Sequence, residues 1–126
     1  ATPTDAIKYR KAVMNTMSGH VAALSLIFGG KVEHQEYLLS HAEALAAAGD
    51  QLGKLFPAGS GEGETDALPA VWSDAAGFQK SADAGKAATA ALRDAVKSGD
   101  KAAIGRSLKP VFDSCKGCHD KFRKEQ

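Results

Sequence analysis

The sequence predicts an all-α fold, an antiparallel up-down-up-down bundle of four helices. Apolar residues recur three and four positions apart through four stretches of the chain, which is the spacing of a helix face that packs inward. Glycine and proline separate these stretches, and no segment alternates apolar and polar residues as a half-buried strand would. Short links between successive helices favour antiparallel neighbours. At 126 residues the chain is expected to form one domain, residues 1–126.

The first predicted helix begins after Thr2, whose hydroxyl can cap it, with proline at the first helical position. Gly29 and Gly30 end this helix, because residues without a Cβ weaken a helix and accept a left-handed last turn. The residues predicted to face inward are Ile7, Arg10, Met14, Met17, Val21, Leu24 and Phe28.

The second predicted helix ends at Pro57, which lacks the N–H that a further turn would need. Its inward residues are predicted to be Leu38, Ala42, Leu45, Gly49, Leu52 and Phe56. The next stretch, PAGSGEGETDALP, shows no helical periodicity, and we expect it to be the crossover between two helical hairpins.

The third predicted helix is closed by Gly99, and Asp100 caps the fourth. The inward residues of the third are predicted to be Val71, Ala75, Phe78, Ala82, Gly85, Thr89, Leu92 and Val96. Those of the fourth are Ile104, Leu108, Val111, Cys115, Cys118 and Phe122, with a bend expected at Pro110. Many of these side chains are small and aromatic residues make up only 6% of the chain, so either the helices approach closely or another group fills the centre.

The overall composition argues against several classes of function. A formal net charge of +1 with 25% charged residues gives no indication of nucleic-acid binding. No apolar run reaches the roughly 18 residues of a membrane span. The chain starts at Ala1 without an initiator methionine, as a mature exported protein does once its signal peptide is removed.

Both cysteines of the chain lie in the sequence CKGCH, residues 115–119. A zinc site would need a fourth ligand from His20, His34 or His41, and a thioredoxin-type dithiol would need a helix N-terminus and a βαβ context. The third possibility is covalent haem attachment, whose signature is C-x-x-C-H. On a helix, Cys115, Cys118 and His119 share one face, so two thioether bonds and one iron ligand can serve the same macrocycle. The geometry favours haem, which would also fill the space between the small side chains.

The chain resembles the class II cytochromes c, in particular the cytochrome c′ family, almost from end to end. The similar segments are KYRKAVM, LFPAG, DALPAVWSDAAGF, SGDKAAIG and CKGCHDKFRK, with the haem-attachment motif near the C-terminus. The resemblance implies one haem c bound through Cys115 and Cys118, with His119 as the proximal iron ligand. It also implies an exported, periplasmic protein that forms a homodimer through its first two helices.

Further haem contacts follow from the resemblance. Arg10 and Lys11 match positions beside the haem propionates, although the family usually has an uncharged residue where Lys11 stands. Asp66 matches another haem-contacting position, Trp72 is expected to pack against the porphyrin, and Arg123 matches a basic residue near the proximal pocket.

Met14 matches the position that faces the open side of the iron, and two functions remain possible. If its sulfur is the sixth ligand, the protein is a one-electron carrier that serves a redox partner protein, which the sequence does not identify. If Met14 only occludes the site, a five-coordinate iron would bind NO or CO, for gas buffering or sensing. An enzyme is not expected, because the sequence shows no distal His and Arg pair of the peroxidase kind. Met17 and His20 are predicted to be core residues, and His34 and His41 to be solvated.

Overall fold

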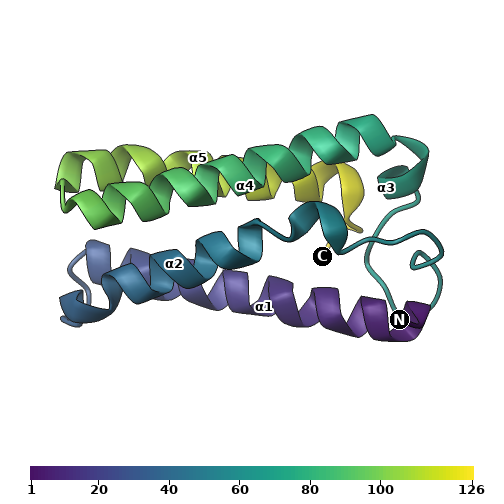
Figure 1. The fold of residues 1–126 in the computed structure, drawn as a ribbon, viewed down its shortest axis with the longest axis horizontal. Helices are drawn as coiled ribbons and strands as arrows, with labels where there is room; N and C mark the ends of the chain where they lie inside the picture. Colours follow the sequence, from purple (N-terminus) through teal and green to yellow (C-terminus); the bar gives the residue numbers. More distant parts are fainter.

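The structure, a computed structural model, describes residues 1–126 and confirms the antiparallel four-helix bundle (Figure 1). The four long helices are α1 (Pro3–Phe28), α2 (Leu38–Gly49), α4 (Ala75–Ser98) and α5 (Lys101–Phe122). The short elements are the 3-10 turns η1 (Gln35–Tyr37) and η2 (Leu52–Lys54) and the one-turn helix α3 (Ala70–Ser73). None of these helices is both long and apolar enough to cross a membrane.

The predicted ends of α1 are confirmed. The Thr2 hydroxyl accepts a hydrogen bond from the Asp5 N–H at 3.1 Å, and Gly30 follows the helix with a left-handed φ of 71°. The inward face is partly as predicted, with Ile7, Arg10, Met17 and Leu24 buried. Met14, Val21 and Phe28 are only half-buried, whereas Val13 and Ile27, which the pattern did not select, are buried.

Two predicted helix boundaries are wrong. α2 ends at Gly49 rather than at Pro57, and η2 replaces its expected last turns. The third predicted helix is interrupted at Asp74, whose backbone has φ −118° and ψ 59° and whose carboxylate accepts a hydrogen bond from the Gly77 N–H at 3.1 Å. Asp74 therefore caps α4, and α3 becomes a separate turn, because local capping outweighs the continuous apolar pattern. α5 begins at the predicted cap Asp100 and runs unbroken through Pro110.

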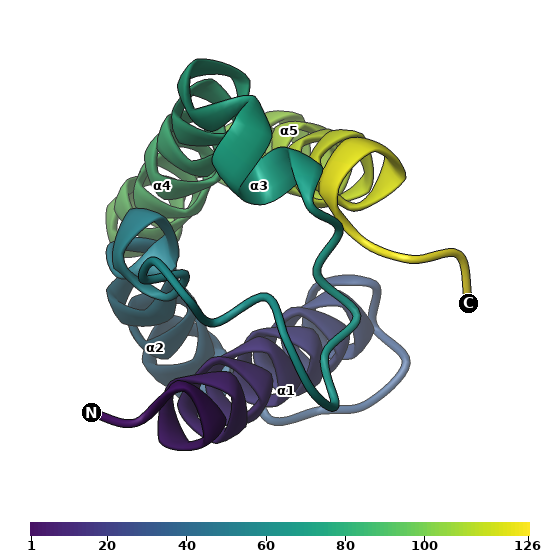
Figure 2. The same cartoon turned by 90° about the vertical axis from the view of Figure 1, so that its right-hand side faces the viewer.

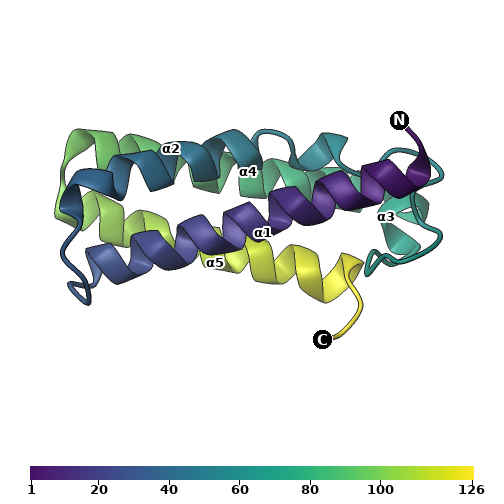
Figure 3. The ribbon, with the colours of Figure 1, turned by 90° about the horizontal axis from the view of Figure 1, so that it is seen from below.

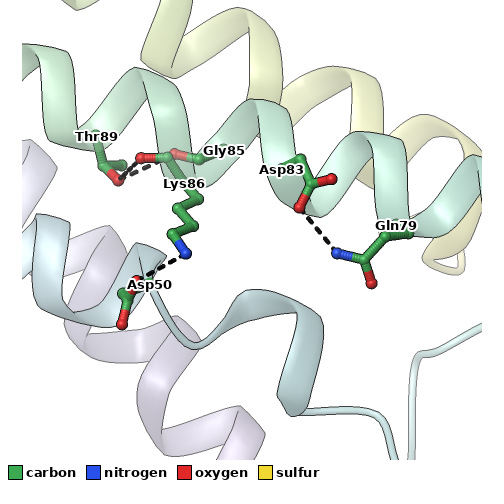
Figure 4. Close-up of polar contacts among 6 residues, drawn as sticks. All are labelled: Asp50, Gln79, Asp83, Gly85, Lys86 and Thr89. Carbon is green, nitrogen blue, oxygen red and sulfur yellow. Dashed lines mark hydrogen bonds and ion pairs between the residues drawn. The ribbon is translucent and has the colours of Figure 1, made fainter.

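α2 and α4 approach each other closely at Gly49 and Thr89. A Cβ at position 49 would overlap the Thr89 hydroxyl, which donates a hydrogen bond to the Gly85 carbonyl at 2.9 Å (Figure 4). An exposed ion pair between Lys86 and Asp50, at 3.1 Å, borders the same contact. Part of the small-residue pattern therefore serves close helix packing.

Successive helices pack directly, α1 on α2, α2 on α4 and α4 on α5, but no comparable packing joins α1 to α5 (Figure 2). Seen from below, α1 runs at an angle to α5, and both chain termini lie toward the end where the crossover is (Figure 3). At the opposite end, Leu24 of α1 and Ile104 of α5 belong to one closed hydrophobic core. α1 and α5 therefore diverge toward the end of the bundle that carries the crossover (Figure 3).

Candidate functional site

A cavity of about 580 Å³ lies between α1, α4, α5 and the crossover. This volume is within the range of pockets that hold cofactors and other small molecules. Its apolar and small lining residues include Met14, Met17, Val21, Leu45, Leu52, Phe56, Phe78, Ala82, Gly85 and Val111. Ala82 of α4 therefore leaves room at the centre of the bundle, whereas Gly85 makes room for Leu52, whose Cδ1 would lie 2.8 Å from a Cβ at position 85.

The face of α5 that carries the CKGCH motif forms one wall of this cavity. Cys115, Cys118 and His119 all line it and are half-buried, and the two thiols are not joined as a disulfide. Burial raises the pKa of both thiols. The pair lies near the C-terminal end of α5 and not at a helix N-terminus, which argues against a thioredoxin-type dithiol.

The surroundings of His119 favour the neutral form that a metal-binding imidazole requires. Burial lowers its pKa below 6.5, the nearby Arg123 guanidinium lowers it further, and Asp120 opposes them in part. The Arg123 guanidinium nitrogen lies 3.2 Å from His119 Nδ1. Arg123 also lines the cavity, so the sequence prediction that it lies near His119 agrees with the geometry.

Arg10 is a buried cation, with only 4% of its surface exposed. Its guanidinium donates hydrogen bonds to the Ser60 hydroxyl at 2.8 Å, the Ser60 carbonyl at 2.7 Å and the Thr65 hydroxyl at 2.6 Å. It also lies over the Phe56 ring, 4.7 Å from the ring centroid. All these partners are neutral, and none of the ion pairs in the structure involves Arg10.

A buried cation without a carboxylate partner is costly, and desolvation lowers the pKa of Arg10. Because Arg10 lines the cavity, a carboxylate group of a ligand there could pair with its remaining N–H groups. Haem carries two such carboxylates. The residues present therefore fit a haem, with a cation for its acidic edge, two thiols and an imidazole on one wall, and an apolar interior.

The crossover is fastened to both sides of the cavity. Arg10 holds it to α1, while the Leu68 N–H donates to the Phe122 carbonyl at 2.8 Å and the Lys124 N–H donates to the Asp66 carbonyl at 2.7 Å. Ser60 and Thr65, the partners of Arg10, were not selected from the sequence. They lie in a Gly-rich loop, where no periodic pattern marks buried residues. The one available indication was the inward position of Arg10 on α1, since a buried arginine needs hydrogen-bond acceptors beside it.

The remaining predicted site residues divide into two groups. Met14, Lys11 and Asp66 line the cavity, and the Lys11 ammonium donates a hydrogen bond to the Glu64 carbonyl of the crossover. Trp72 does not line the cavity. Its indole N–H donates to the Phe56 carbonyl at 3.1 Å and its ring packs against Gly61, so it supports the crossover from the other side.

The three histidines considered for a zinc site do not join the cysteines. His20, His34 and His41 are absent from the cavity wall, and no group of three potential ligands is formed by His, Cys, Asp and Glu side chains. The geometry therefore does not support the zinc hypothesis.

Comparisons with known proteins agree with these features. A family model described as Cytochrome C' matches residues 5–123. Cytochrome c' from Pararhodospirillum photometricum is 39% identical over 128 aligned positions, covering 98% of this chain and 99% of the relative. The solved structure of cytochrome c' from Rubrivivax gelatinosus superposes with a TM-score of 0.91 at 34% identity, covering 98% of each chain.

Other similar structures contain diatomic ligands. A ferrous variant of cytochrome c prime from Alcaligenes xylosoxidans with bound NO has a TM-score of 0.90 at 29% identity, covering 100% of this chain and 98% of that one. A carbon monoxide-bound variant of the same protein has a TM-score of 0.90 at 30% identity, covering 99% and 98% of the two chains. The chain belongs to the cytochrome c′ family of non-enzymatic haem proteins.

Proposed function

We propose that residues 1–126 form one haem-binding domain that takes up NO or CO at the haem face opposite His119. Cys115 and Cys118 would hold one haem c by thioether bonds, and His119 would be the proximal ligand of an iron that can bind a diatomic gas. The observation that carries this proposal is the convergence of these three residues on one wall of a largely apolar cavity of about 580 Å³.

The residues of α1 would select the ligand. Met14 is half-buried and packs against the large hydrophobic core, so its side chain is supported as part of the wall. Charged or strongly polar molecules would lose their hydration there without gaining partners, whereas NO and CO lose little. We assign Met14 the role of an occluding residue on this side. The solved NO and CO forms of the Alcaligenes xylosoxidans protein support the same function here.

Arg10 would bind the haem propionates through its free N–H groups, and Lys11 and Asp66 would border the same edge of the cavity. Arg123 would keep the imidazole of His119 neutral from the proximal side. A haem contact of Trp72 is not part of the proposal, because its side chain faces the crossover.

The second candidate is a one-electron carrier in which the Met14 sulfur is the sixth ligand. The observation in its favour is that Met14 lines the cavity. His and Met ligation would raise the reduction potential and suit electron transfer to a partner protein. The comparisons support the gas-binding function better, since several of the similar solved structures, variants of the Alcaligenes xylosoxidans protein, hold NO or CO.

We also propose that the protein is exported to the periplasm and forms a homodimer through α1 and α2. Both the export and the dimer are proposed from the family resemblance. The exposed apolar side chains Tyr9 and Leu26 of α1 and Tyr37 before α2 support the choice of interface.

The two functions predict different absorption spectra. A five-coordinate iron should give broad high-spin bands that shift when CO is added, and Met14→Leu should leave the spectrum nearly unchanged. The matched control is Met17→Leu, one turn further along α1 at a buried core position. A sharp α band on reduction that is lost in Met14→Leu but kept in Met17→Leu would reject gas binding at an open site and establish the electron carrier.

A further inference from the structure

The wall of the cavity includes residues that solvent reaches. Six of its lining residues are exposed and mark its mouth: Lys11, Asn15, Ser18, Asp66, Phe112 and Gln126. Phe112 of α5 is the aromatic residue among them, with 48% of its surface exposed. It precedes Cys115 by three positions, so the two side chains lie on one face of α5. A haem attached at Cys115 therefore shares this side of α5 with Phe112.

Two lysines flank Phe112 on the same face. Lys109 lies three residues before it and Lys116 four residues after it, and such positions are neighbours on a helix surface. Their side chains are 82% and 76% exposed. Each pairs with an aspartate one turn further on, Lys109 with Asp113 at 2.7 Å and Lys116 with Asp120 at 2.6 Å. Exposed pairs of this kind contribute only about 0–1 kcal/mol, so both ammonium groups can turn to a carboxylate of another molecule.

The charge of the chain is distributed unevenly. Residues 101–126, which form α5 and the C-terminal tail, contain seven lysines and arginines and three aspartates and glutamates. Residues 33–66, which include α2 and most of the crossover, contain seven acidic residues and one lysine. α2 packs on α1 and α4, and no comparable packing joins it to α5 (Figure 2). The α5 side of the bundle therefore attracts acidic molecules, whereas the α2 side repels them.

Reduction of the iron needs a contact of this kind. CO binds ferrous iron, so the gas-binding function proposed above, on which this inference rests, requires that ferric iron first accept an electron. We propose that Lys109, Phe112 and Lys116, here called the docking face, bind an acidic one-electron donor protein. The donor loses one electron and the iron passes from Fe³⁺ to Fe²⁺, and no proton or group is transferred.

The docking face fits a protein better than a membrane or a second copy of the chain. An aromatic residue between charged ones matches the centre and rim of a protein interface. A helix that lies in a membrane surface exposes a broad apolar face, whereas Phe112 is the one large apolar side chain that α5 exposes. The dimer proposed above uses α1 and α2, so the docking face on α5 stays open in that dimer.

The experiment uses the haem-loaded protein and, as a probe, a reduced plant-type [2Fe–2S] ferredoxin, an acidic donor of low reduction potential. Stopped-flow absorption of the haem gives the second-order rate constant of reduction. Between ionic strengths of about 0.01 M and 0.15 M the Debye length falls from about 30 Å to about 8 Å. The rate constant of the wild type should fall by about tenfold or more over this range.

Charge reversal on the docking face should remove this attraction. Lys109→Glu/Lys116→Glu should lower the rate constant at low ionic strength by about tenfold. The matched control is Lys80→Glu/Lys86→Glu on α4, which changes the net charge equally; Lys86 is also exposed and paired with an aspartate. The control should react at about the wild-type rate. Phe112→Ala leaves the charge unchanged and should lower the rate constant at both ionic strengths.

Carbodiimide cross-linking measures the contact without electron transfer, because it joins a lysine to a carboxylate in direct contact. Peptide mapping should place the ferredoxin on Lys109 or Lys116. CO difference spectra report the proposed gas site separately and should be the same in both double variants and the wild type. A protein that is reduced through the docking face but binds no CO would contradict the gas-binding function and support the docking face.

The proposal is overturned if the rate constant does not fall with ionic strength, if both double variants slow reduction equally, or if the cross-links map to Lys80 or Lys86. It is also overturned if Lys109 or Lys116 cross-links to another copy of the chain without ferredoxin. Sedimentation with phosphatidylglycerol vesicles that retains the wild type but not Lys109→Glu/Lys116→Glu would identify a membrane as the occupant and would overturn it as well.

Discussion

Replacing Arg10 by methionine should release the crossover from α1 and lower the stability of the haem-loaded protein. Arg10 is the buried group that ties the crossover to α1, through hydrogen bonds to Ser60 and Thr65. Methionine retains an unbranched apolar stem of similar length, so the substitution removes the guanidinium with little change in packing.

The size of the stability loss depends on which hydrogen-bond partners the three acceptors of Arg10 retain in the variant. The Ser60 hydroxyl still donates to the Pro57 carbonyl, and the Thr65 hydroxyl still accepts from the Ala67 N–H. The Ser60 carbonyl has no other partner and is left unsatisfied. One orphaned acceptor costs about 1–3 kcal/mol and one hydrogen bond to a charged group contributes about 1.5–3 kcal/mol. Since removal of the buried charge recovers part of its desolvation cost, the net loss should be roughly 2–4 kcal/mol.

Urea unfolding followed by circular dichroism at equilibrium measures this loss. The control is Lys11→Met, which removes an exposed cation that bonds to the same crossover and should change stability by less than about 0.5 kcal/mol. Hydrogen exchange at the Ala67 amide should accelerate in Arg10→Met but not in the control. Equal stability of Arg10→Met and wild type would show that Arg10 does not hold the crossover.

Three further changes test separate parts of the structure. Gly49→Ala places a methyl against the Thr89 hydroxyl and should lower the free energy of unfolding by about 1–3 kcal/mol, and an unchanged urea midpoint would contradict the close α2–α4 contact. Gly105→Ala, whose Cβ would lie 3.8 Å from the Phe28 ring, should instead raise it by about 0.5–1 kcal/mol, and a clear loss in urea unfolding would contradict this. In the polypeptide before haem attachment, folding lowers the pKa of His119, so the unfolded chain binds this proton first as the pH falls and the stability of the haem-free protein should decrease as the pH drops through about 6.5. Arg123→Leu should reduce this pH dependence of stability. A urea midpoint that falls by the same amount between pH 7.5 and pH 5.5 in the variant and the wild type would count against the role of Arg123.

The fold was largely predictable because helix periodicity and capping agree in most of the chain. Thr2, Gly30 and Asp100 mark helix ends in the structure as they do in the sequence. The break at Asp74 was missed, since its apolar neighbours continue the helical pattern and the carboxylate cap gives no periodic signal. The end of α2 was missed for a related reason, because η2 keeps Leu52 at a helix-like spacing after the hydrogen-bond pattern has changed.

The candidate site was predictable where several residues share one short motif. Cys115, Cys118 and His119 are placed together by helix geometry alone. The partners of Arg10 depend on the path of the crossover, which sequence periodicity does not describe. Trp72 packs on Gly61 and does not line the cavity, so its haem contact stays a prediction from the matched segment. His41, expected to be solvated, is half-buried, and its Nδ1 lies 3.0 Å from Nδ1 of His20. This contact depends on the rotation of α1 against α2, which neither helix determines by itself.

Intact mass spectrometry of protein matured in a host that attaches haem to C-x-x-C-H motifs tests the central claim most directly. The wild type should show the 13.1 kDa polypeptide increased by the mass of one haem, and the Cys115→Ala/Cys118→Ala double variant should show the polypeptide alone. A wild-type protein that carries no added mass after such maturation would contradict the account of the cavity and of the function built on it.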